Sequence, residues 1–144
     1  MLQISPQGPI VQAAVMVSMA RRQALESSGL PVPDPQRIVA LIDTGASISG
    51  VDPSVLTALN LSATGEADIH TPSTQGSPAR SSTYDVQIGI YAGRPGDLHF
   101  ISDTIQVTSP ILANQGIKAL IGRDILKSCI LVYDGADGFI TLAY

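Results

Sequence analysis

The chain has 144 residues, of which 44% are hydrophobic and 14% are charged, so it is long enough for one domain with a core of its own. The low charge excludes a disordered acidic tail, and a net charge of -4 from 8 basic and 12 acidic residues argues against a nucleic-acid-binding surface. Cys129 is the only cysteine and the two histidines lie far apart in the sequence, so we expect neither a disulfide framework nor a metal site.

The apolar runs are short, rich in Val and Ile, and interrupted by Gly, Pro, Ser and Thr, which predicts an all-β domain with short helices. Residues 10–18 and 37–42 are the first two expected strands. The connection over 19–36 should include a helical turn that ends at Gly29. The alternating prolines Pro31, Pro33 and Pro35 should hold the end of this connection in an extended, solvated path.

Asp52 and Pro53 mark the start of a short helix that should end near Asn60, because Asp is a good N-cap and Pro suits the first helical position. Residues 67–71 and 82–91 should then form the arms of a hairpin whose tip, 72–78, is rich in turn-forming residues. The sequence predicts a strand over 98–108, a strand over 118–121 that leads into a brief helix at 123–127, and a closing hairpin over about 129–144.

The N-terminal residues give no sign of export or membrane insertion. The first 20 residues carry no charged side chain, but polar residues and prolines interrupt them, and no basic segment precedes an apolar stretch. The sequence therefore predicts neither a signal peptide nor a membrane span. We expect a soluble, cytoplasmic protein, while noting that a chain this short can be one domain of a longer, targeted protein.

The segment with the most chemical information is Leu41-Ile42-Asp43-Thr44-Gly45-Ala46-Ser47, in which an apolar strand runs directly into an acid. No cation stands beside Asp43 in this run. Gly45 permits a tight turn and close backbone approach, and the Thr44 hydroxyl can anchor that turn. We therefore expect backbone geometry, rather than a counter-ion, to present the Asp43 carboxyl.

A second apolar strand followed by glycine lies near the other end, at Ala119-Leu120-Ile121-Gly122-Arg123-Asp124-Ile125-Leu126. Together the two segments resemble the signature segments of the retroviral-type aspartic proteases, the retropepsins. The closing hairpin also resembles the last hairpin of a pepsin-type lobe. The resemblance covers about residues 10–144 and implies a single domain over residues 1–144. The implied fold is a closed β-barrel of the acid-protease type, with one lobe per chain.

The resemblance implies an aspartic endopeptidase that hydrolyses peptide bonds in extended polypeptide substrates and needs no cofactor. Such hydrolysis requires two carboxylates that share a proton, one to activate a water and one to assist at the scissile carbonyl. This chain has one Asp-Thr-Gly, and Asp52, Asp103 and Asp124 lack a matching turn. We therefore expect a homodimer in which Asp43 of each chain meets its twin at a two-fold axis.

Carried over residue by residue, the resemblance makes Asp43 the catalytic residue and Thr44 the residue whose hydroxyl reaches across the dimer axis. Gly45 would meet the substrate backbone, while Ile121 and Gly122 would pack behind the Asp43 turn. The other expected site residues are Ala46 and Arg123 as supports, Ser47 on the substrate-binding floor, and Thr71, Pro72, Ser73, Thr74, Gln75 and Gly76 at the tip of a flap formed by about residues 67–91. Many retroviral enzymes carry an acid where Ser47 stands, and that acid pairs with the arginine, so Arg123 needs another partner here.

Two other interpretations stay open. A catalytically silent dimer of the same fold could bind peptides or serve as an assembly module, because a protein can lose its activity and still keep the residues that define its fold. An unrelated β-barrel for a small ligand would instead be a monomer with an enclosed apolar cavity. Among single residues, Arg123 is as well explained by a surface salt bridge as by a supporting role. His70 is interpreted as an ordinary exposed histidine, and Cys129 as a small core or interface residue.

Overall fold

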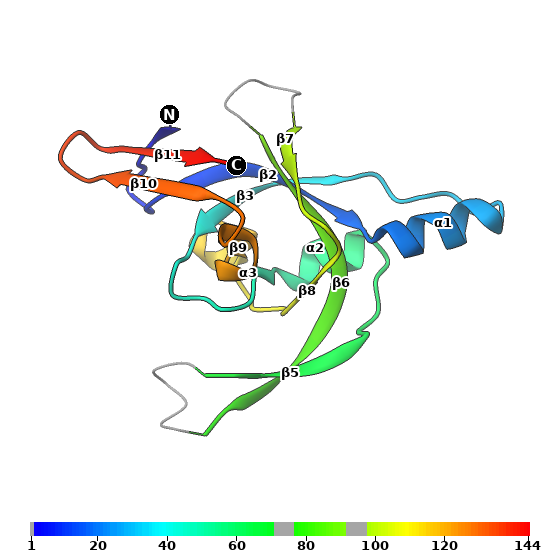
Figure 1. Cartoon of the computed structure of the whole chain (residues 1–144). Helices are drawn as coiled ribbons and strands as arrows, with labels where there is room; N and C mark the ends of the chain where they lie inside the picture. The colour runs from blue at the N-terminus through cyan, green and yellow to red at the C-terminus, as the bar shows by residue number, and fades with distance from the viewer. Residues whose placement is uncertain (1, 71–76, 92–97) are drawn as a thin grey trace.

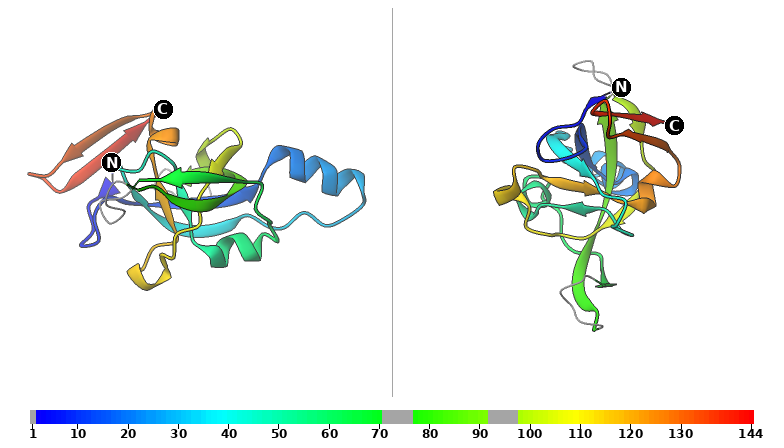
Figure 2. Two further views of the ribbon diagram at one scale, coloured as in Figure 1. Left: turned by 90° about the horizontal axis from the view of Figure 1, so that it is seen from below. Right: turned by 90° about the vertical axis from the view of Figure 1, so that its left-hand side faces the viewer.

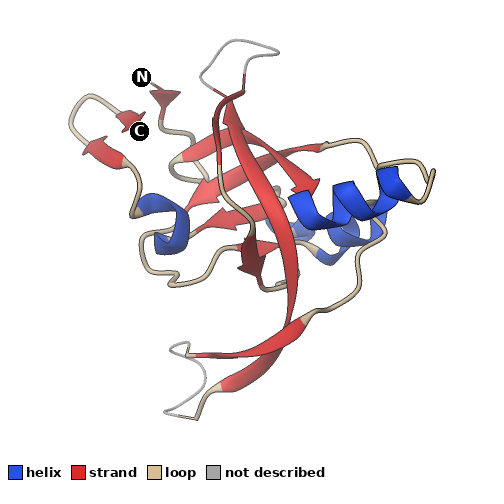
Figure 3. Cartoon of the chain, turned by 45° about the vertical axis from the view of Figure 1, so that its right-hand side comes forward, coloured by secondary structure: helices blue, strands red, loops and turns tan. Residues whose placement is uncertain are grey.

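A computed structural model describes residues 2–70, 77–91 and 98–144 (Figure 1). Over these residues the chain is mostly strand, with three short helices and one 3-10 turn (Figure 3). This confirms the predicted all-β class with short helices. No helix in the described part of the chain has the length and apolar character needed to cross a membrane.

The first two long strands pair as neighbours. β2 (Ile10–Val17) and β3 (Gln36–Ile42) run antiparallel, and α1 (Met19–Ser27) occupies the connection between them. The Ser18 hydroxyl caps α1 by accepting a hydrogen bond from the Arg21 amide, and Gly29, at φ +67°, takes the chain out of the helix. The predicted helical turn is therefore a nine-residue helix that extends away from the rest of the molecule (Figure 1).

The main sheet has the strand order β4-β9-β3-β2-β6-β5, and β7 and β8 both pair with β6. The strands not yet placed are β4 (Gly50–Val51), β5 (Gly65–Ile69), β6 (Ala79–Tyr91), β7 (Leu98–Ile101), β8 (Ile105–Val107) and β9 (Ala119–Ile121). β3 and β9 run parallel, whereas the other paired strands of this sheet run antiparallel. The predicted hairpin is present as β5 and β6, but residues 71–76, which hold most of its expected tip, lie outside the described residues.

No sheet among the described strands closes into a continuous barrel, so the closed barrel that the resemblance implies stays a prediction. β6 divides its pairing between two partners. Its first residues, Ala79 to Thr83, pair with β5, whereas Val86 to Ile90 pair with β2. The β5-β6 hairpin therefore extends away from the body (Figure 1). Thr108, the residue after β8, reaches the β4 edge, where its carbonyl accepts a hydrogen bond from the Val51 amide.

The single strand predicted over 98–108 is two strands. Ser102 separates β7 from β8, since its hydroxyl donates to the Asp103 carbonyl and accepts from the Ile88 amide. A local side-chain bond of this kind competes with the strand ladder. The sequence pattern predicted that both segments are extended, but it did not predict the interruption between β7 and β8.

The buried core is aliphatic and draws on one face of the long strands, with alternate residues from Val11 to Val17 on β2 and from Val86 to Ile90 on β6. Helices α2 (Pro53–Ala58) and α3 (Arg123–Leu126) pack against it. The largest fully buried apolar side chains are Leu59, Ile88, Ile121, Ile125, Ile140, Val15, Val51, Val86 and Val107. Burial of each such side chain contributes about 1.5–3 kcal/mol.

A second, three-stranded sheet closes the chain. β10 (Ile130–Asp134) and β11 (Phe139–Ala143) form the predicted closing hairpin, and β1 (Leu2–Gln3) adds to β11, which the sequence analysis did not predict. Ile140 on β11 is fully buried and joins this sheet to the main core. The β5-β6 hairpin and this C-terminal sheet lie at opposite ends of the molecule (Figure 2).

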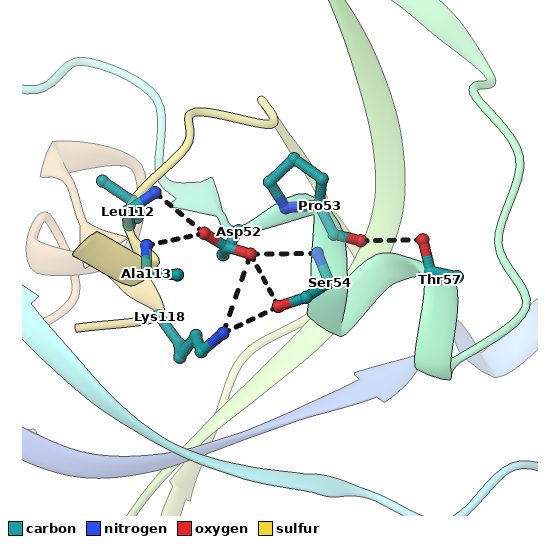
Figure 4. A network of polar contacts seen from close by, with 7 residues as sticks. All are labelled: Asp52, Pro53, Ser54, Thr57, Leu112, Ala113 and Lys118. Carbon is teal, nitrogen blue, oxygen red and sulfur yellow. Dashed lines mark hydrogen bonds and ion pairs between the residues drawn. The ribbon is translucent and has the colours of Figure 1, made fainter. Parts of the chain in front are cut away.

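Asp52 links α2 to the segment before β9. It is 3% exposed, and its carboxylate accepts hydrogen bonds from the amide and hydroxyl of Ser54 and from the amides of Leu112 and Ala113 (Figure 4). Lys118 Nζ lies 3.9 Å from Oδ1. Burial alone would raise the pKa of the Asp52 carboxyl, but these hydrogen bonds, led by that from the Ser54 hydroxyl, outweigh it and hold the pKa well below its ordinary value.

We expect Asp52→Asn to lower the free energy of unfolding near neutral pH by about 1–3 kcal/mol, because an amide nitrogen must then face a backbone donor. The carboxylate stabilises the fold fully above its unfolded-state pKa, about 3.8, and that stabilisation is lost as the pH falls towards the lower folded-state pKa. The difference between wild type and variant in urea unfolding should therefore be constant from pH 7 to 5 and shrink from pH 4 to 2. A difference that is unchanged at pH 2 would contradict this account, and the exposed Asp34→Asn is the control.

Candidate active site

The Asp43 turn is anchored to the end of a parallel strand pair. Ile42 on β3 lies opposite Ile121 on β9, and the Asp43 amide continues this pairing by donating to the Ile121 carbonyl at 2.9 Å. The Ala46 amide then donates to the Asp43 carbonyl at 3.2 Å, and the Gly45 amide donates to Asp43 Oδ1 at 3.0 Å. Within the described part of the chain, the Gly45 amide therefore orients the carboxyl, and no ion pair holds it.

Gly122 lies directly behind this turn, and the close approach there requires glycine. A Cβ on Gly122 would lie 2.8 Å from the Ala46 carbonyl oxygen, which is closer than side-chain carbons come to backbone atoms. The same carbonyl accepts from the Arg123 amide at 2.8 Å. The Ile-Gly-Arg segment and the Asp43 turn, which are far apart in the sequence, thus form one packed unit.

A second connection between the two segments runs through Ser49 and Asp124. The Asp124 carboxylate accepts from the Ser49 amide at 2.9 Å, from the Ser49 hydroxyl at 2.6 Å and from the Ile125 amide. The Ser49 hydroxyl in turn accepts from the Gly122 amide at 2.9 Å. Ser49 is fully buried. The sequence analysis missed this pair, because nothing near either residue indicates that they meet.

Arg123 contacts the turn through its side chain as well. Its guanidinium donates to the Thr44 carbonyl at 2.8 Å, so the partner that the sequence left open is a backbone oxygen of the Asp43 turn. Both residues are exposed. The Thr44 hydroxyl, which is expected to reach a second chain, stays a prediction.

A pocket of about 460 Å³ lies beside Asp43. It brings together four of the predicted residues, Asp43, Gly45, Ala46 and Ser47, while the predicted flap residues Thr71–Gly76 lie outside the described part. Asp68, Ile69 and His70, which fall within the predicted flap, also line it. The sequence analysis did not assign the remaining lining residues to the site: Ile48, Gly50, Thr108, Pro110 and Leu120. Thr108 and Pro110 reach the pocket only through the fold, and the close contact of Pro110 with Gly50 places them there.

This arrangement can carry proton-transfer chemistry at one carboxyl. The pocket combines mainly aliphatic walls with the exposed edge of the Asp43 turn, which suits a ligand that is partly apolar and also has backbone-like polar groups. No three His, Cys, Asp or Glu side chains are grouped as metal ligands over the residues described.

We expect Gly122→Ala to destabilise the protein by about 1–3 kcal/mol, since the new methyl group must displace the Ala46 carbonyl. Thermal unfolding followed by circular dichroism measures the change. Gly135→Ala is the matched control, because its Cβ would meet only ordinary contacts at 3.5 Å or more. Equal melting temperatures for the two variants would show that the approach at Gly122 is not a constraint.

A comparison of this chain with protein-family models and with curated proteins found no match.

Proposed function

We propose that this chain is an aspartic endopeptidase of the retropepsin type, active as a homodimer whose two Asp43 carboxyls share one proton. The observation that carries the proposal is the setting of Asp43: it stands at the end of β3, is oriented by the Gly45 amide, and faces a pocket of about 460 Å³. A carboxyl presented to a ligand pocket without a cation is suited to exchange a proton with a substrate or water.

The chemistry needs a second carboxyl close to the first. Two full negative charges about 3 Å apart would repel by about 5 kcal/mol at an effective dielectric of about 20, so one proton stays bound between them. The ionised partner removes a proton from a water, and that water attacks the peptide carbonyl. The protonated partner supports the carbonyl oxygen as the tetrahedral intermediate forms.

Two other carboxylates near these elements already have structural roles. Asp52 accepts four hydrogen bonds and Asp124 accepts three. Asp68 stands on β5, outside the Asp43 turn, and lies 3.7 Å from the Arg80 guanidinium on the neighbouring strand. Asp43 of a second copy is therefore the partner we propose, because a two-fold axis presents it in the same turn and orientation.

The C-terminal sheet supplies a surface for that second copy. Successive side chains along β10 and β11 point to opposite faces of this sheet. Leu131, Ile140 and Leu142 face the core, and the opposite face is open to solvent. Ile130 is 69% exposed and Val132 is 53% exposed on this outer face. β10 is also an edge strand whose outer side has no partner among the described strands. An exposed apolar face with a free strand edge favours association.

The substrate that this site suits is an extended polypeptide. The Asp43 turn forms one side of the pocket, and Asp68, Ile69 and His70 at the end of the β5-β6 hairpin arm contribute to its lining. An extended peptide can offer backbone hydrogen bonds to such elements and place alternate side chains in pockets. No cofactor enters this mechanism.

We expect Asp43→Asn to lower cleavage of denatured protein or of a peptide library between pH 4 and 7 by at least about a hundredfold, because an amide can neither take nor give the proton. Rates of product formation measure the loss. Asp34→Asn, an exposed acid outside the site, should retain wild-type rates. Equal rates for wild type and Asp43→Asn would overturn the enzymatic proposal. A wild-type chain that forms dimers and binds peptides without cleaving them would instead identify the silent binding module.

We expect Val132→Glu to weaken the dimer at least about tenfold, because a charge would be buried in the proposed interface. Sedimentation equilibrium measures the dissociation constant. Leu30→Glu is the matched control, since Leu30 is 56% exposed but follows α1, away from the C-terminal sheet (Figure 1). If Leu30→Glu weakens the dimer and Val132→Glu does not, the interface does not lie at the C-terminal sheet.

A further inference from the structure

We propose that Asp68 makes the pocket beside Asp43 select lysine or arginine side chains of the substrate. This inference rests on the proposed function, and it identifies the class of substrate that the site takes. The pocket has aliphatic walls from Ile48, Ile69 and Leu120. Asp43 and Asp68 are the acidic residues that line it, and no lysine or arginine is among its described lining residues.

The charge of Asp68 is only partly balanced within the chain. Asp68 stands opposite Arg80 in the β5-β6 register, with 3.7 Å between carboxylate and guanidinium. The same guanidinium lies closer to Glu66, at 3.4 Å. One cation therefore serves two carboxylates, which leaves this group of three side chains with one net negative charge.

The contact of Asp68 with Arg80 is also easily exchanged. Their side chains are 58% and 77% exposed, and exposed pairs of this kind contribute about 0–1 kcal/mol. A substrate cation can therefore approach the Asp68 carboxylate without first breaking a strong bond. Glu66 differs in one respect that matters here: it shares Arg80 but does not line the pocket.

Lysine and arginine match this combination of walls and charge. Their aliphatic stems can lie along Ile48, Ile69 and Leu120 while the charged end reaches Asp68. Glutamate of similar length would bring a third negative charge next to Asp43 and Asp68. In a two-fold dimer the pocket occurs twice, so the preference should appear at one position on each side of the scissile bond.

The test uses quenched fluorescent peptides with a fixed apolar pair at the scissile bond. Lysine, norleucine and glutamate are placed in turn at each of three positions on either side. The enzyme variants are wild type, Asp68→Asn, Asp68→Lys and the matched control Glu66→Gln, all assayed at one pH. The quantity compared is the ratio of kcat/KM for the lysine peptide to that for the norleucine peptide.

We expect wild type and Glu66→Gln to favour lysine over norleucine by about two- to fivefold at one position on each side. Asp68→Asn should bring that ratio to about one, Asp68→Lys should favour glutamate, and 0.5 M salt should weaken the wild-type preference. A ratio that is the same in wild type and Asp68→Asn overturns the proposal.

If wild type cleaves none of the peptides at any pH, the peptidase function fails, but the selectivity is still tested. Fluorescence anisotropy with the same peptides then gives the ratio of dissociation constants for each variant. The inference is supported if wild type binds the lysine peptide more tightly and Asp68→Asn abolishes that preference. It is overturned if wild type shows no lysine preference or binds none of the peptides.

Discussion

The parallel pairing of β3 with β9 is the constraint on which the rest of this molecule depends. It places two loops side by side that are nearly eighty residues apart, and the hydrogen bond from the Asp43 amide to the Ile121 carbonyl extends the ladder into the site. The close approach at Gly122 and the Ser49–Asp124 pair hold the two loops together from behind. The position of the Asp43 carboxyl is therefore set by backbone contacts, which leave its free edge available to a ligand.

The acids of this protein fall into two groups with opposite physical settings. Asp52 and Asp124 are surrounded by donors, and each joins segments that are distant in the sequence. Asp43 and Asp68 line a pocket and have few donors among the described residues. A buried or half-buried carboxylate needs hydrogen-bond donors, so the first group serves stability. The second group has acceptor capacity that the described residues leave largely unused.

Much of the fold could be predicted because its signals are local. Asp52 and Pro53 mark the start of α2, Gly29 marks the end of α1, and the run from Ile130 to Asp134 with the turn after it predicts the closing hairpin. The errors arose where a distant partner decides the outcome. Ser102 breaks one expected strand into two through its bonds to Ile88 and Asp103.

The sequence by itself determined the strand-rich class and the tight turn at Asp43, because each depends on a few consecutive residues and their backbone preferences. Only the tertiary structure decided that Arg123 donates to the Thr44 carbonyl, that Ser49 meets Asp124, and that Asp68 shares a pocket with Asp43. These are contacts between segments whose separation in the chain carries no information about distance. They exist because the β3-β9 and β5-β6 pairings bring those segments together.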